Sequence, residues 1–485
     1  MPHTVNTLSA AKYFPSLQFD ADIIGKLSQS GPRYTSYPTA DRFSAAFNYG
    51  DFLDAVVAQR HRAVPAPLSL YLHIPFCESV CYYCGCNKIV TRDHSKAVRY
   101  LEYLRQEIAL QSLLFDGMNQ LTQLHLGGGT PTYLSDAQMG ELMEFLRRHF
   151  AFAPDEQGEY AIEIDPRTVD AARVHSLRAQ GFNRLSLGVQ DFEPAVQQAV
   201  NRVQSERQTL DVMAAARDAG FRSISVDLIY GLPHQSMDSM RRTLAKVIEA
   251  NPDRIALYNY AHMPHLFKPQ RRIDAADLPT PALKLDLLAL SINTLCAAGY
   301  EYIGMDHFAR PMDDLAVAQR QGRLQRNFQG YSTHAGANLI ACGVSAISAV
   351  GATYSQNEKE LEAYYAALDA GRLPVARGLR LSADDLLRRI VIQSLMCNFE
   401  LSIGAVEEAY PVGFWQHFAA ERPRLEQLAA DGLLVIDGQW ITVTLRGRLL
   451  IRNICMVFDR YLSLAREQEP QAQPQSQPLR YSQTI

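Results

Sequence analysis

The sequence predicts an α/β protein built on a parallel sheet that closes into a partial (β/α)6 barrel of the TIM type. Between about residues 68 and 310, short apolar segments alternate with longer amphipathic ones. Such alternation is typical of a parallel sheet with right-handed crossovers, and about six units favour a barrel over a short open sheet. The length of 485 residues leaves room for an N-terminal arm and a small C-terminal domain.

Strands are predicted where short apolar runs are bounded by polar or turn residues. They are Leu68–Ile74, Gln123–Leu126, Tyr160–Ile164, Arg184–Val189, Ser223–Ile229 and Arg254–Tyr258, with Glu301–Met305 as a further candidate. In the first of these, aliphatic residues alternate with Tyr71 and His73, so these two rings share one face of the strand. Helices are predicted at Ser95–Leu114 and at Ser135–Phe150, where Ser135 is the capping residue.

We expect the chain to divide into four regions. These are an N-terminal arm with helices (1–66), the catalytic barrel with an extension (67–375), a C-terminal domain that covers the substrate (376–466), and a tail (467–485). Gln, Pro and Ser dominate the tail, and such a composition predicts disorder from Gln468 to Pro478.

The C-terminal domain is predicted to be a small, mostly helical α+β module. Leu381–Leu395 and Leu425–Ala430 have helical patterns, and Leu434–Ile436 and Gln439–Thr444 flank the turn Asp437-Gly438. This order resembles a winged helix, which often binds DNA. However, Lys plus Arg number 47 against 51 for Asp plus Glu, which gives a net charge of −4 and no electrostatic footprint for nucleic acid or an anionic membrane. A substrate lid or packing module is therefore favoured.

The sequence also predicts a cytoplasmic protein. The longest nearly apolar run, Leu339–Ala352, is shorter than the roughly 20 residues that a bilayer requires, and it contains glycines and serines. Residues 1–20 lack the basic start and apolar block of a secretory signal.

The eight cysteines are unevenly distributed. Cys296, Cys342, Cys397 and Cys455 are scattered among apolar neighbours, where cysteine is usually a small buried hydrophobe, whereas Cys77, Cys81, Cys84 and Cys86 share one segment. The spacing C-x3-C-x2-C allows three thiolates to bind three irons of a cubane cluster, which leaves the fourth iron open to a small molecule. A zinc site would need a second cysteine pair, and a fully ligated electron-transfer cluster would need Cys86 at a cramped spacing. The metal ligands are therefore predicted to be Cys77, Cys81 and Cys84.

This cysteine segment resembles the signature of the radical S-adenosylmethionine enzymes. Its wider context resembles one family among them, the oxygen-independent coproporphyrinogen III oxidases, over about residues 20 to 465. The matching segments are 31–41 (GPRYTSYPTAD), 71–88 (YLHIPFCESVCYYCGCNK), 127–134 (GGGTPTYL), 188–192 (GVQDF), 227–233 (DLIYGLP), 259–264 (NYAHMP), 304–311 (GMDHFARP) and 327–333 (NFQGYST).

The resemblance implies a reaction and a set of cofactors. The reaction is the oxidative decarboxylation of two propionate side chains of coproporphyrinogen III to vinyl groups, giving protoporphyrinogen IX in anaerobic haem biosynthesis. The implied cofactors are a [4Fe-4S] cluster and S-adenosylmethionine, with two molecules of the latter per chain as one option. Reductive cleavage of S-adenosylmethionine would give a 5′-deoxyadenosyl radical. A small electron-transfer protein would be the reductant, and the family suggests a monomer.

The resemblance also assigns roles to individual residues. Tyr71, Gly128, Glu163 and Ile347 belong to the first S-adenosylmethionine, and Tyr83, Gln190, Asp227 and the backbone of Ala261 to the second. The run through Gly128, Gly129 and Thr130 matches the segment that receives the amino group of the cofactor, although a tight turn would also use glycines. Arg202 suits the cofactor carboxylate, because a guanidinium binds carboxylates as a fork.

Simpler interpretations stay open for several of these residues. Glu163 and Arg202 fit equally well as members of ion pairs, and His73 as a hydrogen-bonded barrel histidine. Tyr71 and His73 are the catalytic candidates, with His73 as a proton donor or an orienting group. Arg33, Arg310 and Arg326 lie in matching segments and suit a tetracarboxylate substrate, or else serve packing or the surface.

Two other functions fit the same cysteine loop. One is a haem-binding or haem-delivering protein on a radical-enzyme scaffold, and the other is a radical enzyme that acts on, or methylates, a different tetrapyrrole. The segment Cys84-Gly-Cys86-Asn-Lys and the N-terminal segment PRYTSYP favour the oxidase.

Overall fold

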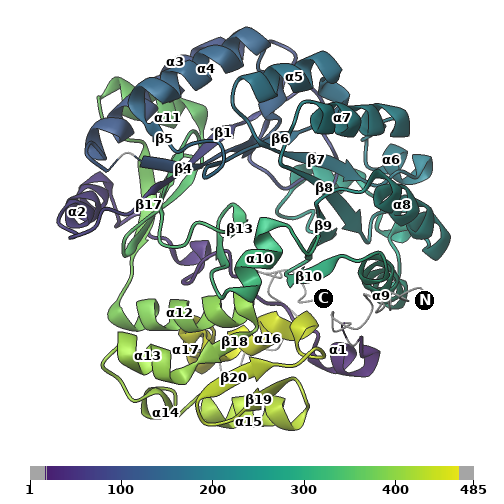
Figure 1. The fold of residues 1–485 in the computed structure, drawn as a ribbon, viewed down its shortest axis with the longest axis vertical. Coiled ribbons are helices and arrows are strands. Elements are labelled where there is room, and N and C mark those ends of the chain that lie inside the picture. The colour runs from purple at the N-terminus through teal and green to yellow at the C-terminus, as the bar shows by residue number, and fades with distance from the viewer. Residues whose placement is uncertain (1–16, 18, 119, 469–485) are drawn as a thin grey trace, which may run out of the picture.

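The computed structural model describes residues 17, 19–118 and 120–468 (Figure 1). Its main sheet contains a block of six neighbouring strands that pair in parallel, in the order β9-β8-β7-β6-β4-β1. They are β1 (Leu68–Ile74), β4 (Gln120–Gly128), β6 (Glu159–Ile164), β7 (Arg184–Gln190), β8 (Ser223–Tyr230) and β9 (Arg254–Asn259). All six coincide with predicted strands, and the predicted fold class is confirmed.

Helices follow these strands and form an arc outside the sheet (Figure 1). They are α3 (Ser95–Leu114), α4 (Asp136–His149), α5 (Ala171–Ala179), α6 (Pro194–Ala199), α7 (Glu206–Asp218), α8 (Met237–Ala250) and α9 (Pro281–Ala297). As predicted, Ser135 caps α4, and Gln138 completes a capping box. The aliphatic residues of β1 are fully buried against this outer layer, which leaves the alternate side chains to the barrel interior.

The sheet continues beyond the barrel at both edges. Next to β1 lie β14 (Asn338–Cys342), which is parallel, and then the antiparallel strands β15 (Ile347–Val350), β16 (Thr353–Asn357) and β17 (Val375–Arg380). Next to β9 lie β11 (His307–Ala309) and β10 (Glu301–Gly304), both antiparallel to their neighbours. The further candidate strand therefore exists as an antiparallel edge strand, because Met305 and Asp306 adopt positive φ and reverse the chain.

Short elements complete this part of the chain. They are β2 (Phe76–Cys77), β3 (Ile89–Val90), β5 (Ala151–Phe152), α10 (Asp314–Arg320), β12 (Gln325–Asn327), β13 (Gly330–Ser332) and α11 (Leu361–Asp369). Of the scattered cysteines, Cys342, Cys397 and Cys455 are buried as expected, whereas Cys296 is half-buried.

The C-terminal module is mostly helical, as predicted. It contains α12 (Ala383–Asn398), α13 (Ile403–Ala409), α14 (Phe414–His417), α15 (Arg422–Ala430), α16 (Ile451–Cys455), α17 (Arg460–Gln468) and a sheet of β18 (Glu400–Ser402), β20 (Trp440–Val443) and β19 (Leu434–Ile436). The predicted hairpin thus gains a third strand, too short to show an alternating pattern. Strand β17 crosses the expected boundary at 375/376, and residues 469–485 of the predicted disordered tail lie outside the described residues.

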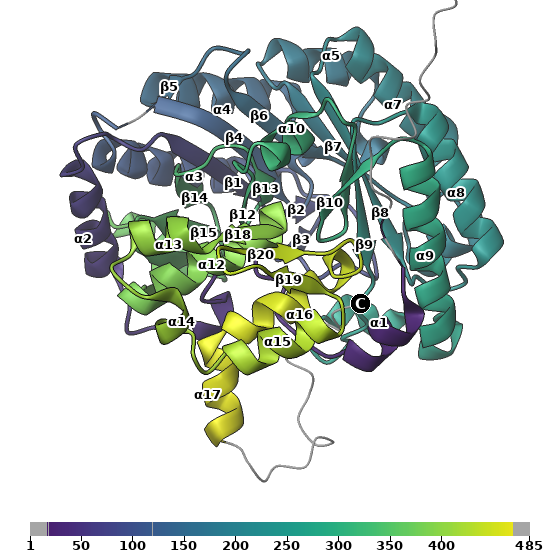
Figure 2. The same ribbon diagram turned by 60° about the horizontal axis from the view of Figure 1, so that its bottom comes forward.

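The N-terminal arm connects this module to the barrel, and the module lies across the open side of the arc (Figure 2). The arm contains α1 (Ala21–Leu27) and α2 (Tyr49–Arg60). Between them, the Tyr34 hydroxyl donates to Asp459 over 3.0 Å, and Arg452 Nε donates to the Pro32 carbonyl over 2.9 Å. Nowhere in the described part of the chain does a helix combine the length and apolarity needed to cross a bilayer.

Candidate active site

A cavity of about 460 Å³ lies at the carboxyl ends of the barrel strands and contains most of the predicted site residues. In barrels of parallel strands, this end carries the active site. The predicted residues that line the cavity are Cys77, Cys81, Tyr83, Cys84, Gly128, Gly129, Thr130, Glu163, Gln190, Arg202 and Asp227. The folded chain therefore brings together segments that are as far apart in the sequence as the cysteine loop and β8.

Four predicted residues lie outside the lining of this cavity: Tyr71, His73, Ala261 and Ile347. Ala261 follows β9, and Ile347 begins β15, where it contacts an apolar cluster around Phe43. The assignment of these four residues to cofactor or catalysis stays a prediction that rests on the resemblance alone.

Tyr71 and His73 form a hydrogen-bonded pair on the inner face of β1. His73 Nε2 lies 2.9 Å from the carbonyl of Asn87 and so carries the proton, which makes Nδ1 the acceptor for the Tyr71 hydroxyl at 3.2 Å. Burial lowers the pKa of His73. The Tyr71 ring stacks on His125, with ring centroids 5.8 Å apart. Both ring nitrogens of His73 are therefore hydrogen-bonded, one of them to Asn87 of the cysteine loop.

The cysteine loop is held at both of its ends. Strands β2 and β3 pair in parallel, so the start and the end of the loop lie side by side. The Ile89 amide donates to the Pro75 carbonyl over 2.7 Å, and Asn201 Nδ2 donates to the Val80 carbonyl over 2.7 Å. These bonds fix the loop relative to the sheet and to the segment after α6 before any cofactor binds.

Each of the three predicted ligand thiols has a polar neighbour. The Cys77 sulfur lies 3.5 Å from the Thr130 hydroxyl, and the Cys81 sulfur accepts a hydrogen bond from Arg202 Nη1 over 3.5 Å. A hydrogen bond from Cys86 lowers the pKa of Cys84 to about 5, whereas burial raises the pKa of Cys77 to about 11. Because the thiolate is the form that binds metal, the lowered pKa of Cys84 favours the form that a metal ligand requires.

The glycine turn after β4 lies directly against the cysteine loop. A Cβ atom on Gly129 would lie 2.7 Å from the Phe76 carbonyl oxygen, and one on Gly128 would lie 2.6 Å from the His73 ring. Gly128 also has a φ of 115°, which side-chain-bearing residues rarely adopt. Both the close approach and the backbone conformation therefore require glycine, and they bring main-chain groups to the cavity wall.

Two carboxylates of the cavity have opposite pKa shifts. Burial by itself raises the pKa of Glu163, but the hydrogen bond and charge of His125 at 3.1 Å and the Gly128 amide together outweigh it, so the net shift is downward. Asp227 is buried next to the negative charge of Glu163, and its pKa rises to about 7. Only Ser186 donates to Asp227 in the described structure, over 3.3 Å. The cavity thus holds one stable carboxylate and one that titrates near neutrality.

Arg202 belongs to a buried ion network and not to a surface ion pair. Its side chain contacts Asp165 over 3.1 Å, the Gly188 carbonyl over 2.6 Å and Cys81. Arg167 also contacts Asp165 and reaches the Cys81 sulfur at 3.8 Å. The sequence analysis assigned no role to Asp165 or Arg167. Their position in the sequence could have indicated a role, because both follow the strand that carries Glu163, at the carboxyl end where the site forms.

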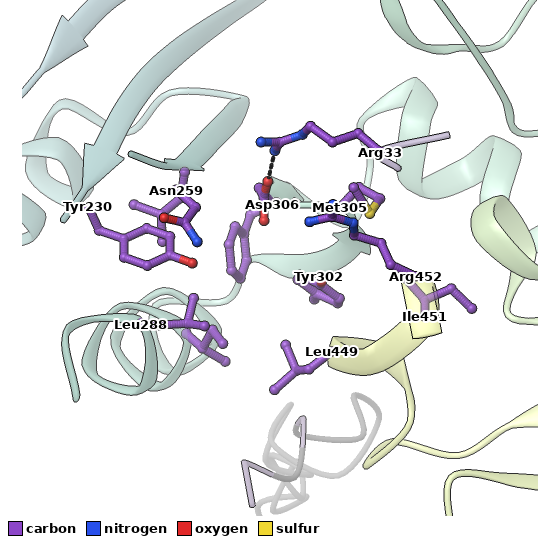
Figure 3. A pocket seen from close by; sticks show the side chains of 13 residues that line it. Arg33, Tyr230, Asn259, Leu288, Tyr302, Met305, Asp306, Leu449, Ile451 and Arg452 are labelled. Atoms are coloured by element: carbon purple, nitrogen blue, oxygen red, sulfur yellow. Dashed lines mark hydrogen bonds and ion pairs between the residues drawn. The ribbon is translucent and has the colours of Figure 1, made fainter. Parts of the chain in front are cut away.

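The three candidate substrate arginines occupy different places. Arg310 donates to the Ala298 carbonyl over 2.8 Å and lies above the Tyr300 ring, so it serves packing. Arg33 pairs with Asp306 in a narrow cavity of about 30 Å³ between the N-terminal arm, β9 and the C-terminal module (Figure 3). In the same view, Arg452 reaches into this cavity from α16. Arg326, the third, lines a separate cavity.

The donor set of the large cavity fits an iron–sulfur cluster. Cys77, Cys81, Cys84 and Cys86 line the cavity together with Gly128, Gly129 and Thr130 of the glycine turn. Within the described residues, no three His, Cys, Asp or Glu side chains converge on the position of one metal ion. A [4Fe-4S] cluster does not require such convergence, because each cysteine binds a different iron atom.

Family models and sequence relatives agree with this site. Residues 71–247 match the radical SAM superfamily, and residues 381–450 match the HemN C-terminal domain. Oxygen-independent coproporphyrinogen III oxidase from Pseudomonas aeruginosa is 51% identical over 447 residues, covering 92% of this chain and 97% of that protein. The protein of the same name from Escherichia coli is 52% identical over 446 residues, covering 92% of this chain and 96% of its own.

A solved structure has the same fold over nearly the whole chain. Coproporphyrinogen III oxidase (HemN) from Escherichia coli superposes with a TM-score of 0.88 at 50% identity, covering 92% of this chain and all of that one. Identity at this level, over almost the full length of each relative, shows the family. The chain therefore belongs to the oxygen-independent coproporphyrinogen III oxidase family of radical S-adenosylmethionine enzymes.

Proposed function

We propose that this chain converts two propionate side chains of coproporphyrinogen III to vinyl groups by oxidative decarboxylation, giving protoporphyrinogen IX. It is a radical S-adenosylmethionine oxidoreductase of anaerobic haem biosynthesis. One observation carries the proposal: the cysteines of the C-x3-C-x2-C loop line the same cavity as the glycine turn and Glu163. The near full-length identity to oxidases of this name supports the choice of substrate.

Cys77, Cys81 and Cys84 are the proposed ligands of the [4Fe-4S] cluster. The exposed Cys86 remains outside the ligand set, and its hydrogen bond to Cys84 stabilises the thiolate of that ligand. Arg202 and Arg167 donate to the sulfur of Cys81, and hydrogen bonds to cluster sulfurs are among the factors that set a cluster's reduction potential.

The remaining residues of the cavity are proposed to bind S-adenosylmethionine. Gly128, Gly129 and Thr130 present main-chain groups to its amino group, and Glu163 is the acidic partner at the same wall. Tyr83, Gln190 and Asp227 are proposed contacts of a second molecule. When bound, the cluster and S-adenosylmethionine supply one electron and a 5′-deoxyadenosyl radical.

The protein's own contribution is to position groups and to exclude water. Tyr71 and His73 support the cysteine loop from behind, and the C-terminal module covers the open side of the barrel. Exclusion of water matters because a carbon radical attacks whatever lies near it, so the target carbon must be held in contact.

The proposed partners follow from the same chemistry. The cluster needs a one-electron reductant, which we take to be a small electron-transfer protein. Gly85 to Asn87, in the last part of the cysteine loop, are exposed and accessible to such a protein. We further propose a cytoplasmic monomer that binds neither nucleic acid nor membranes, since the net charge of −4 provides no electrostatic attraction to either.

The decisive experiment is an anaerobic turnover assay. The cluster is reconstituted and reduced, S-adenosylmethionine and coproporphyrinogen III are added, and 5′-deoxyadenosine and the tetrapyrrole are followed together. Formation of protoporphyrinogen IX with 5′-deoxyadenosine supports the proposal in full. Cleavage of S-adenosylmethionine without a change in the tetrapyrrole would support a radical enzyme but contradict coproporphyrinogen III as its substrate. If the enzyme has an intact cluster but forms neither 5′-deoxyadenosine nor protoporphyrinogen IX, and if it binds haem tightly, the haem-delivery function replaces the proposed one.

A further inference from the structure

Arg326 is a buried cation without a counter-ion. It lies in the middle of β12 and is 5% exposed. Its Nε and Nη1 atoms are buried and have no hydrogen-bond partner, and within the described residues no carboxylate lies within ion-pair distance of it. Its one close partner is the ring of Tyr331, whose centroid lies 4.8 Å from the guanidinium carbon.

The other buried arginines of the chain have strong acceptors. Arg184 contacts Glu159 over 3.0 Å, Arg202 contacts Asp165 over 3.1 Å, and Arg388 contacts Glu421 over 2.7 Å. Arg452 donates to main-chain carbonyls of the N-terminal arm. Burial of an unpaired charge costs several kcal/mol, so buried charges are nearly always paired. The isolation of Arg326 therefore indicates that an anion from outside the chain completes its site.

The cavity next to Arg326 has the composition of an anion site. It measures about 290 Å³ and lies between the barrel, the N-terminal arm and α12. Arg62 and Arg389 join Arg326 in its lining, and none of the described residues that line it is Asp or Glu. Side-chain amides, among them those of Gln325 and Asn327, also line it. The lining of the cofactor cavity, in contrast, combines basic residues with four carboxylates, Glu78, Glu163, Asp165 and Asp227.

A third cavity shares lining residues with both the anion site and the cofactor site. It measures about 140 Å³, lies inside the barrel, and is lined in part by His307, Gln329 and Tyr331. It shares Gln123 and Asn327 with the anion site, and it shares Glu163, Ser186 and Asp227 with the cofactor cavity. Gln329 has no hydrogen-bond partner at either end of its amide. Because the three cavities share lining residues, the anion site lies next to the part of the barrel that holds the cofactor site. The unpartnered amide of Gln329 is available to a ligand there. The anion site is therefore relevant to the reaction.

We propose that Arg326, with Arg62 and Arg389 beside it, binds a propionate carboxylate of the tetrapyrrole and thereby orients the substrate in the barrel. The inference rests on the proposed function. A carboxylate is the anion that a guanidinium binds as a fork, and the substrate carries such groups at its periphery. Arg326 is thus a specificity-determining residue. The alternative ligand of the same chemical class is a small carboxylate that is not part of the tetrapyrrole.

The test compares two substitutions in the reconstituted enzyme. Arg326→Gln removes the charge at the proposed site, and Arg323→Gln removes an exposed arginine three positions earlier that contacts only Gln321. The ligands are coproporphyrin III, a stable oxidised analogue of the substrate, and its tetraamide, which has no carboxylate. Binding is followed by porphyrin fluorescence, and steady-state turnover is measured with coproporphyrinogen III.

We expect Arg326→Gln to weaken coproporphyrin III binding about 10- to 100-fold and to raise the KM by a similar factor. Its affinity for the tetraamide should equal that of the parent, because that ligand has no carboxylate to lose a partner. Cluster content and S-adenosylmethionine binding should be retained, and Arg323→Gln should behave as the parent. Arg326→Lys, which keeps the charge without the fork, should recover part of the affinity.

Thermal unfolding without ligand separates this role from a structural one. Since Arg326 has no ionic partner in the described structure, its replacement by Gln should leave the melting temperature unchanged or raise it. A clear fall in melting temperature would assign Arg326 to packing and overturn the proposal. Equal affinities of parent and variant for coproporphyrin III would also overturn it. Stabilisation of the parent, but not of Arg326→Gln, by acetate, with unchanged coproporphyrin binding, would assign the site to a free carboxylate instead.

The result also distinguishes this inference from the proposed function. If the parent enzyme forms protoporphyrinogen IX and Arg326→Gln does so with unchanged KM, only the role of Arg326 fails. If the parent itself forms none, the proposed function fails first.

Discussion

At the amino ends of the barrel strands, buried carboxylates pair with arginines, whereas Asp227, towards the carboxyl ends, has no ion-pair partner in the described chain. At the amino ends, Arg184 contacts Glu159 over 3.0 Å, and Arg254 contacts Asp313, which caps α10, over 2.9 Å. Gln123 also donates to Glu159 over 3.0 Å. At the other end, Asp227 has only the Ser186 hydroxyl as a donor within the described chain.

The pKa values of two carboxylates express this difference. Burial acts to raise the pKa of both. At Glu159, the charges of Arg184 and Arg254 outweigh burial and lower the pKa to about 2. At Asp227, burial acts together with the charge of Glu163 and raises the pKa to about 7. Glu159 at the amino end is thus part of a stabilising ion network, whereas Asp227 at the other end can still interact with a ligand.

Two residues at the cofactor end also have an uncommon backbone conformation. Gln190 and Asn201 have positive φ, 67° and 52°. Non-glycine residues pay a free-energy cost for this conformation, and it persists where surrounding structure enforces it. We expect substitutions at the two ends of the barrel to affect different properties.

The largest effect on activity is expected from Cys81→Ser. Loss of one cluster ligand should abolish the iron–sulfur absorbance and lower turnover by more than about three orders of magnitude, because the reaction then has no source of electrons. The circular dichroism spectrum of the cofactor-free chain should be unchanged. Cys86→Ser is the matched control and should retain full iron content. A Cys81→Ser protein with full cluster absorbance would contradict the ligand assignment.

The largest effect on stability is expected from Arg254→Ala, at the opposite end. The substitution leaves Asp313, whose side chain is 4% exposed, without its charged partner. We expect the free energy of unfolding to fall by about 3–5 kcal/mol, as measured in urea. Arg207→Ala, which removes an arginine whose side chain is 91% exposed, is the control and should change it by less than about 0.5 kcal/mol. A similar small change for both would show that the paired charges contribute little.

A smaller effect, on ligand affinity, is expected from Arg202→Ala. Loss of the guanidinium should weaken S-adenosylmethionine binding about tenfold, because a charge-assisted hydrogen bond is removed. Iron content should be preserved, since Arg202 donates to Cys81 without being a ligand. Equilibrium dialysis with labelled cofactor measures the first quantity and iron analysis the second. Unchanged cofactor affinity would restrict Arg202 to its ion pair with Asp165.

An effect on stability that disappears at low pH is expected from Asp227→Asn. Because the pKa of Asp227 is raised from 3.8 to about 7, the folded chain keeps a proton that the unfolded chain releases between these values. The stability of the parent therefore falls as pH rises through this window. Asp227→Asn cannot ionise, so we expect it to be more stable than the parent by about 4 kcal/mol at pH 8 and nearly equal to it at pH 4. An equal difference at both pH values would contradict the shift.

Much of the barrel was predictable because its periodicity is local. The bounds of β1 and α3 match the prediction to the residue, and the cap at Ser135 is where its side chain indicated. The grouping of the three candidate ligand cysteines on one cavity was also predictable, since a three-cysteine spacing within one loop depends on no distant contact. The antiparallel edge at β10 and the three-residue strand β18 were not, because partners from elsewhere in the chain define them.

The sequence by itself determined the strand–helix alternation, the cysteine loop and the glycine turn, because neighbouring residues specify each of these. Only the tertiary structure decided which charges meet. It placed Arg167 and Arg202 at Cys81, engaged Arg310 in packing, and left Arg326 without an ionic partner in the described chain. The reason is physical: a charged side chain has the same local signature whether paired or not, and its pairing depends on residues that are distant in sequence and adjacent only after folding.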